Sequence, residues 1–322
     1  MKASLSRRAF VKSSLIASAA LPLALRAENS PAKAAPTAAA PSAREAMPFG
    51  ELGGQQISRL VMGGNLIGGW SHSRDLGYVS TLMRRYNSPS KIRETLEIAE
   101  AQGITAINTW VMDDNSALFE HWKCGGKMKW FAQARFDANG GLSQFQRAID
   151  EGAIGVHLTG DAAESLLAQE KFERVSESVQ FIKAHKRIAG VAAHDLRVIV
   201  ECEKAGVSPD FYQKTFHTHD YYTAPKDGET GPIGAHENSW CENAPAVVEV
   251  MSRIKKPWIA FKVLAAGAIP PRAAFPHAFN SGADFILVGM FDWQLEEDCK
   301  LARRVVTAVK GPNSKRTRPW FA

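Results

Sequence analysis

Short apolar runs alternate with amphipathic segments along most of this chain, beginning near residue 49. The runs have the length of buried β-strands, and between them apolar side chains recur at the spacing of a helix. Residues 90–103 are an example, because Ile92, Leu96 and Ala99 share one helical face and Gly103 ends the segment. We predict further helices from about residue 161 and at 196–205, 272–281 and 294–309, and strands at 59–63, 104–111, 128–134, 153–158, 188–193, 210–216, 258–264 and 284–288.

Eight strands separated by helices predict an α/β fold, namely a single (β/α)8 TIM barrel. A doubly wound open sheet is the alternative, and it would carry a glycine-rich turn leading from its first strand directly into a helix. Residues 62–69 contain several glycines, but we expect no helix directly after them. This expectation favours the barrel.

The N-terminus has the pattern of an export signal. Residues 5–12 resemble the twin-arginine signal motif, with Arg7 and Arg8 as the pair, Phe10 as the apolar residue and Lys12 at the end. The apolar stretch 15–25 is short for a membrane span and has the length of a signal-peptide core. Cleavage after Ala27 is expected, and a retained membrane anchor is the alternative.

The signal resemblance implies export by the twin-arginine machinery to the periplasm or the cell exterior, with no stable membrane anchor after cleavage. Residues 28–46 are rich in Ala and Pro without periodicity, so we predict a disordered linker between a signal peptide at 1–27 and a barrel domain at 47–322. Proteins exported in the folded state often load a cofactor first, and we therefore expect a bound cofactor.

The net charge of the chain is concentrated in the predicted signal. Residues 1–27 hold five Lys and Arg residues and no acid, so removing them takes the formal charge from +6 to +1. A nearly neutral protein offers no electrostatic case for binding nucleic acid. The cysteines lack metal-type spacing, and we expect buried or free thiols at Cys124, Cys202, Cys241 and Cys299.

Three stretches resemble the aldo/keto reductase superfamily, whose members are NADP-linked oxidoreductases built on a barrel. Residues 50–64 are similar to that family's opening hairpin and first strand, Val156-His157 to the end of its fourth strand, and residues 283–297 to its last strand and helix. The resemblance implies an N-terminal β-hairpin ahead of the barrel and NADP as a cofactor.

The family's catalytic pattern combines a tyrosine, a lysine, an aspartate and a histidine. His157 matches the histidine, whereas Asn108 stands where the aspartate is expected and Gln133-Ala134-Arg135 where the lysine is expected. No tyrosine follows Asn108 within about a dozen residues. We therefore expect the family's fold without its usual carbonyl reduction, since the proton donor is missing.

The active site of a TIM barrel lies at the C-terminal ends of its strands, and here those ends carry histidines. Three consecutive predicted strands end in His157, His194 and His217, so their imidazoles can converge on one divalent metal ion. A metal-free polar site and unrelated placements are the alternatives. The predicted metal ligands are His157, His194, His217, His219 and Asp220.

Lys262 lies within an apolar strand, where a lysine is costly unless it is paired or functional. Pointing inward, it can act as a base or a Schiff-base nucleophile. Asp195 and His157 are the other predicted catalytic residues. The alternative is a Lys262 that faces outward or pairs with Asp195 or Glu237.

Two connections on the same face are candidates for substrate binding. The long segment 218–243 contains aromatic side chains and is typical of a lid, and segment 70–75 could contact an anionic group. The predicted substrate-binding residues are Asn65, His72, Arg74, Asn108, Arg135, Tyr221, Glu237 and Trp240.

These patterns together predict an exported barrel enzyme, a metal-dependent lyase, isomerase or hydrolase that acts on a small polar, carbohydrate-like substrate. Two alternatives stay open: an NADP-linked oxidoreductase of the aldo/keto reductase type, and a non-catalytic barrel that binds a ligand.

Overall fold

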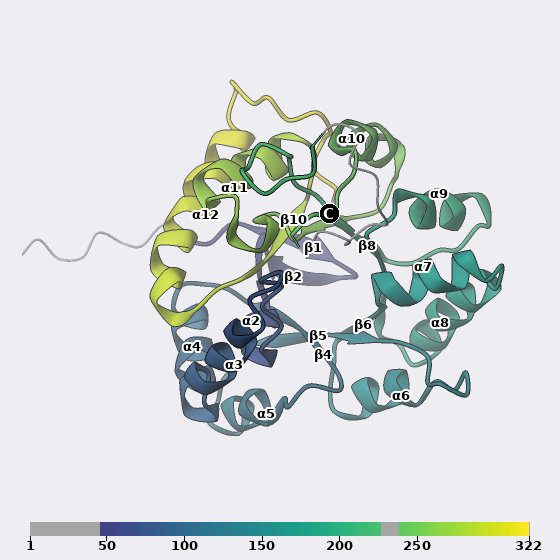
Figure 1. Ribbon diagram of the computed structural model, residues 1–322, viewed down its shortest axis with the longest axis horizontal. Coiled ribbons are helices and arrows are strands. Elements are labelled where there is room, and N and C mark those ends of the chain that lie inside the picture. The colour runs from purple at the N-terminus through teal and green to yellow at the C-terminus, as the bar shows by residue number, and fades with distance from the viewer. Residues whose placement is uncertain (1–45, 227–237, 322) are drawn as a thin grey trace, which may run out of the picture. The chain divides into compact units, whose positions relative to one another are not determined.

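The computed structural model describes residues 46–226 and 238–321. Eight parallel strands close into a barrel, and helices surround it (Figure 1). This confirms the predicted (β/α)8 barrel. In order around the barrel, the strands are β10 (Phe285–Gly289), β3 (Leu60–Gly63), β4 (Ala106–Trp110), β5 (Lys129–Ala134), β6 (Gly155–Leu158), β7 (Ile188–Ala193), β8 (Phe211–Thr215) and β9 (Trp258–Phe261).

The helices follow the strands along the chain and pack on the outside of the barrel. None of the described helices is long and apolar enough to cross a membrane. Their bounds are α2 (Asn65–Gly68), α3 (Tyr78–Tyr86), α4 (Pro89–Ala101), α5 (Ser116–Lys123), α6 (Ser143–Asp150), α7 (Gly160–Ala168), α8 (Glu173–Ala184), α9 (Leu196–Lys204), α10 (Ala244–Arg253), α11 (Pro271–Asn280) and α12 (Leu295–Lys310), with short 3-10 turns η1 (Ala265–Gly267) and η2 (Asp292–Gln294).

Three details differ from or lie beyond the sequence predictions. The glycine-rich stretch 62–69 itself contains the one-turn helix α2, and no helix follows directly after it, as predicted. The strand predicted at 258–264 ends at Phe261, because Lys262 takes a left-handed backbone conformation with φ of 55°. The predicted signal peptide and all of the linker except Ala46 lie outside the described residues.

The barrel interior is filled by a layer of large apolar side chains. Phe131 and Phe211 meet edge to face with ring centroids 5.8 Å apart. Gly155 and Gly190 on neighbouring strands leave the space that these rings occupy, since a Cβ at either position would lie within 2.6 Å of a ring carbon. This layer forms the apolar floor beneath the C-terminal face of the barrel.

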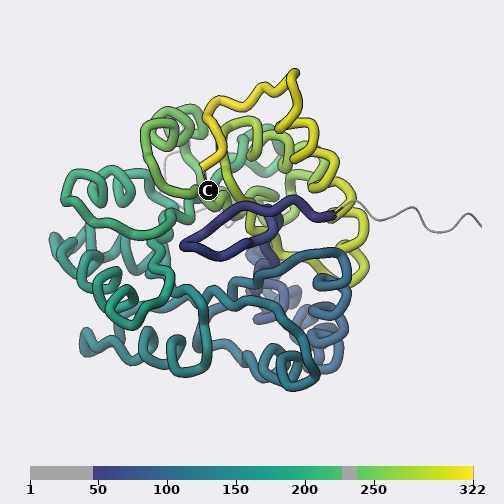
Figure 2. The backbone as a smooth tube through the Cα atoms, turned by 180° about the vertical axis from the view of Figure 1, so that it is seen from behind, coloured from purple at the N-terminus to yellow at the C-terminus, as the bar shows by residue number. Residues whose placement is uncertain are grey.

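The opposite, N-terminal end of the barrel is closed by a hairpin and by the C-terminal segment (Figure 2). The predicted hairpin is present as β1 (Phe49–Leu52) paired with β2 (Gln55–Ser58). Beside it, the buried carboxylate of Asp284 pairs with Arg316 at 2.9 Å and Arg318 at 3.0 Å. The functional surface is therefore left to the C-terminal face.

Candidate functional site

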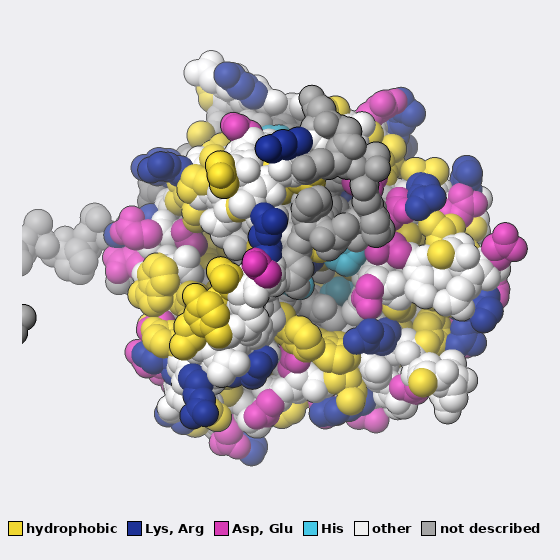
Figure 3. Space-filling model, viewed as in Figure 1, with side chains coloured by type: hydrophobic (Ala, Val, Ile, Leu, Met, Phe, Trp, Pro, Cys, Tyr) yellow, Lys and Arg dark blue, Asp and Glu magenta, His cyan; other side chains and the backbone are white. Residues whose placement is uncertain are grey.

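A cavity of about 550 Å³ opens at the C-terminal ends of the barrel strands. Histidine side chains are visible in the hollow at the centre of this face (Figure 3). The cavity lies above the apolar floor, at the place where barrel enzymes bind their ligands. Of the residues predicted for the site, those that line it are Asn65, His72, Asn108, Arg135, His157, His194, Trp240 and Lys262.

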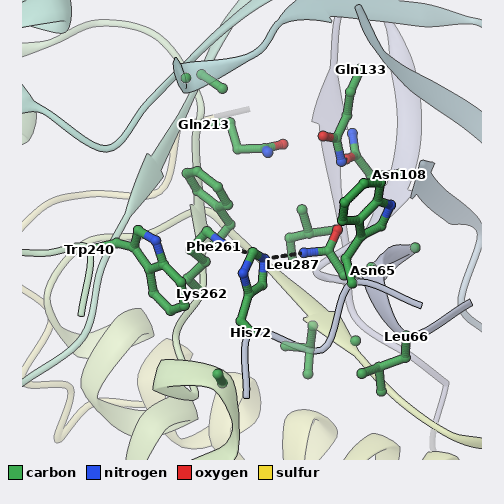
Figure 4. A pocket seen from close by; sticks show the side chains of 18 of the residues that line it. Asn65, Leu66, His72, Asn108, Gln133, Gln213, Trp240, Phe261, Lys262 and Leu287 are labelled. Carbon is green, nitrogen blue, oxygen red and sulfur yellow. Dashed lines mark hydrogen bonds between the residues drawn. The ribbon is translucent and has the colours of Figure 1, made fainter. Parts of the chain in front are cut away.

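Lys262 and His72 meet on one wall of this cavity (Figure 4). Lys262 Nζ lies 3.0 Å from His72 Nε2, and it also lies 3.8 Å from the centre of the Trp240 ring. Asn65 Nδ2 approaches the same His72 nitrogen at 3.1 Å. The geometry makes His72 Nε2 an acceptor for two N–H donors, and thus places the proton of the neutral ring on Nδ1.

Burial, and then the positive charge of Lys262, lower the pKa of His72 to about 3. The imidazole is therefore neutral at physiological pH and holds the lysine by accepting its hydrogen bond. The alternative pairing of Lys262 with Asp195 is not formed: Asp195 caps α9 by accepting from the Arg197 backbone N–H, pairs with the Arg197 guanidinium, and does not line the cavity.

A second polar network crosses β4, β5 and β6. Gln133 Nε2 donates to Asn108 Oδ1 at 2.7 Å, and Asn108 Nδ2 donates to His157 Nε2 at 2.9 Å. His157 Nδ1 then faces the Leu158 carbonyl at 3.3 Å. Burial lowers the pKa of His157 to about 4, so the whole network is neutral. Asn108 is the residue at which the family resemblance led us to expect an aspartate, and Gln133 begins the stretch 133–135 at which it led us to expect a lysine.

The histidines predicted as metal ligands do not converge. His217 is buried outside the cavity lining, with Nδ1 2.9 Å from the Thr218 carbonyl and Nε2 accepting from the backbone N–H groups of Trp240 and Cys241 at 3.0 and 3.1 Å. His219 Nε2 lies 2.8 Å from the Cys241 carbonyl. Both rings therefore anchor the segment that carries Trp240.

These contacts do not fit the predicted metal centre. A ring nitrogen that accepts hydrogen bonds from N–H groups offers no lone pair to a metal, and this applies to His217 and His157. Within the described residues, 46–226 and 238–321, no group of three or more His, Cys, Asp or Glu side chains could hold a metal ion. Glu237, a predicted substrate contact, lies outside the described residues.

His194 does reach the cavity, where Glu164 holds it. The Glu164 carboxylate lies 3.2 Å from His194 Nδ1 and accepts from the backbone N–H of His194 and of Asp195. Behind it, Lys214 is buried and donates to the carbonyls of His194 and Thr215 and to the Thr215 hydroxyl. Burial lowers the pKa of Lys214 to about 8, and this lysine supports the strand ends without lining the cavity.

The remaining predicted residues lie at the rim or away from the cavity. Arg135 is at the rim, where it pairs with Asp161 at 3.2 Å and stacks on the ring of Trp110 at 4.8 Å. Tyr221 donates through its hydroxyl to the Asn238 carbonyl. Neither Tyr221 nor the exposed Arg74 and Asp220 line the cavity.

The glutamines that line the cavity, Gln133, Gln213 and Gln294, were not among the predicted residues. Gln133 and Gln213 each follow a core phenylalanine by two positions, in Phe131-Ala132-Gln133 and Phe211-Tyr212-Gln213. Side chains two apart on a strand point to the same face, so both amides lie one layer above the apolar floor. A polar residue in an apolar strand, the signal that identified Lys262, would have found them.

Comparisons with known proteins bear on the fold. No protein-family model matches the sequence, and no curated protein matches it significantly. Among solved structures, the chain is similar to Gox0644 in its apo form, with a TM-score of 0.54 and 10% identity over 84% of this chain and 96% of that one.

An aldo-keto reductase from Bacillus halodurans in its holo form is similar with a TM-score of 0.52 and 10% identity, over 84% of this chain and 99% of that one. At such identities the similarity shows a shared fold. The chain is thus a (β/α)8 barrel with the architecture found in an aldo-keto reductase.

Proposed function

We propose that the protein is an enzyme that binds a polar, carbohydrate-like substrate in the cavity and acts on it as a lyase or isomerase through Lys262. The single observation that carries the proposal is the contact between Lys262 Nζ and His72 Nε2 at the cavity wall. A lysine held by a neutral acceptor, on the face of a tryptophan, is an arrangement suited to a reacting carbonyl group.

The chemistry follows from the donors of the ammonium group. A lysine ammonium carries three N–H donors, and one of the Lys262 donors meets His72. The ammonium group can donate to the carbonyl oxygen of a substrate and stabilise the negative charge that forms when a neighbouring carbon passes its proton to His194, which lines the same cavity. Electrostatic stabilisation of this kind is commonly a large contribution to catalysis.

The walls of the cavity suit a sugar-like molecule. Trp70, Trp110 and Trp240 supply aromatic surface, and Trp70 meets Trp110 edge to face at 5.9 Å. Asn65, Gln133 and Gln213 supply neutral polar groups around the same space. Aromatic faces pack on C–H surfaces and amides bond to hydroxyls, as a polyhydroxylated substrate requires.

The proposal is tested by deuterium exchange. The protein is incubated in D2O with a panel of aldoses, ketoses and keto acids derived from sugars, and NMR follows exchange at the carbon next to the carbonyl. In Lys262→Met, which keeps the apolar stem on Trp240, we expect exchange to fall by about 100-fold or more. Lys171→Met, an exposed lysine outside the cavity lining, is the matched control.

Unchanged exchange in Lys262→Met would overturn the proposal. Lys262 can act as a hydrogen-bond donor or as a Schiff-base nucleophile. Borohydride trapping followed by mass spectrometry distinguishes these roles, because only a Schiff base at Lys262 leaves a covalent adduct. Ligand binding without exchange or turnover would instead support the non-catalytic barrel.

A second candidate is an NADP-linked oxidoreductase, which the architecture shared with an aldo-keto reductase favours. The neutral Asn108–Gln133 pair gives it less support, because the charged pair of that family's pattern is replaced. Titration with NADPH followed by tryptophan fluorescence tests it directly. Among the described residues a divalent metal finds no group of ligands, so a metal-dependent reaction stays a prediction that elemental analysis tests.

Export by the twin-arginine pathway is part of the proposal, on the basis of Arg7 and Arg8. Replacing both with lysine is expected to keep the full-length protein in the cytoplasm. Cell fractionation measures the outcome, and continued export of the double variant would refute this route.

A further inference from the structure

The side-chain oxygen of Gln213 is buried without a hydrogen-bond partner among the described residues. Gln213 is 2% exposed, and its Oε1 accepts from no donor in the barrel. The residue nevertheless lines the cavity, and its amide extends from β8 into the same space that Gln133 enters from β5 (Figure 4). The oxygen therefore belongs to a side chain of the cavity wall and has no donor among the described residues.

The contrast with Gln133 shows that this arrangement is specific. Both glutamines stand two positions after a core phenylalanine, but Gln133 Nε2 donates to Asn108 and so belongs to a protein network. Thr159 also lines the cavity, and its hydroxyl oxygen is buried and lacks a partner among the described residues. It caps no backbone N–H of α7. Two residues of the cavity wall thus each carry a buried oxygen that no donor of the described residues engages.

A buried amide oxygen without a donor destabilises the folded protein relative to an apolar side chain of the same shape. A donor inside the cavity removes this penalty, and in the free protein water can supply it. A ligand that displaces the water must bring an O–H or N–H group of its own, or lose affinity.

We propose that Gln213 is a specificity-determining residue whose Oε1 accepts a hydrogen bond from a hydroxyl group of a polyhydroxylated substrate, with Thr159 as a second hydroxyl contact. This inference rests on the proposed function for the kind of substrate, and on the unpartnered oxygens for the position. A site that leaves a buried acceptor unpaired rejects the analogue that lacks the hydroxyl.

The first test is the stability of the free protein. If the oxygen serves a ligand, Gln213→Met removes an unpaired acceptor at nearly constant volume, and we expect Tm to rise by about 2 °C. Gln133→Met is the matched comparison, and it should lower Tm because Asn108 Oδ1 loses its donor. A clear fall in Tm for Gln213→Met would show that the glutamine serves folding and would overturn the inference.

The second test locates the ligand. Crystals of the protein and of Gln213→Met are soaked at high concentration with glycerol, D-xylose and D-glucose. We expect a hydroxyl oxygen within hydrogen-bonding distance of Gln213 Oε1, and in solution a loss of affinity of about tenfold in Gln213→Met. Polyols that bind only elsewhere, or no polyol in the cavity, would overturn the inference, as would binding of NADPH alone at this oxygen.

The two proposals fail in different ways. If a polyol binds Gln213 but deuterium exchange does not depend on Lys262, the proposed reaction is refuted and the proposed Gln213 contact is supported. If exchange depends on Lys262 but the substrate does not touch Gln213, the proposed Gln213 contact is refuted and the proposed reaction is supported.

Discussion

Lys262 Nζ and His72 Nε2 lie 3.0 Å apart although 190 residues separate them in the chain. The lysine extends from the end of β9 and the histidine from the connection after α2, so the pair exists only in the closed barrel. Because burial and Lys262 together keep the pKa of His72 low, the histidine is a fixed acceptor rather than a second cation. His72 thus fixes the position of the Lys262 ammonium group at the cavity wall.

Acid should destabilise the protein through its buried histidines. The pKa values of His157 and His217 are lowered from 6.5 to about 4 by burial, so below pH 6.5 the unfolded chain binds protons that the folded protein does not. Stability is therefore lost as pH falls from about 6.5 towards 4. For His157 alone the loss is about 1 kcal/mol at pH 5.5.

Urea unfolding at pH 7.5 and 5.5 measures this effect. In His157→Gln the fall in the free energy of unfolding between the two pH values should be smaller by about 1 kcal/mol. His185→Gln, at the exposed end of α8, serves as the control. An equal pH dependence in the wild type and His157→Gln would contradict the assignment.

Charge should be poorly tolerated in the Asn108–Gln133 network. Asn108 is 2% exposed and donates to His157, so Asn108→Asp buries a carboxylate and removes that donor. We expect a loss of about 3 kcal/mol at neutral pH. Adding Gln133→Lys supplies a cation at the 2.7 Å contact and should restore part of the lost stability. A double-mutant cycle measures the coupling, and additive effects would show that the two positions do not interact.

His217 should act on the Trp240 segment rather than on a metal. His217→Ala leaves two buried N–H groups, those of Trp240 and Cys241, without an acceptor, and we expect a loss of about 2 kcal/mol of stability. Tryptophan fluorescence should change as well, since Trp240 loses its anchor. His219→Ala, whose ring is exposed and makes one bond to this segment, should have a smaller effect.

Elemental analysis of the wild type, His157→Ala and His217→Ala tests the alternative, in which these histidines bind a metal ion. One transition metal per chain in the wild type, lost in both variants, would restore the metal centre that the sequence predicted. It would also require the rings to move from their present hydrogen bonds.

The buried carboxylate of Asp284 should be essential to the N-terminal end of the barrel. Burial raises its pKa even though Arg318 and Arg316 oppose this, and its oxygens also accept from the backbone N–H of Trp258 and Phe321. Asp284→Asn leaves two buried guanidinium groups without their counter-ion, and we expect a loss of about 3 kcal/mol or more. Thermal unfolding measures it, and a Tm within a degree of the wild type would refute the role.

Much of the site could be predicted from the sequence, because polar residues at the ends of apolar strands must lie at the C-terminal face of a barrel. Lys262, Asn108, His157 and His194 were identified in this way, and all line the cavity. Gln213 carried the same signal but was not predicted, because a neutral amide costs less to bury than a charged group and is therefore a weaker sign of a functional site. Glu164 carried no such signal, because it lies on α7 and reaches the site only through packing.

The sequence by itself determined the barrel, because strand and helix periodicity depend on neighbouring residues along the chain. The hairpin was predicted from the resemblance of residues 50–64 to the opening hairpin of a known family. Only the tertiary structure decided what each histidine does. Three histidines lie at the C-terminal ends of consecutive strands, yet His157 accepts from an asparagine, His194 meets a glutamate, and His217 binds backbone N–H groups. Those partners come from distant segments, and a ring nitrogen already engaged by one of them is not available to another. Spacing along the chain places a side chain at the site, but the folded chain alone selects its partner.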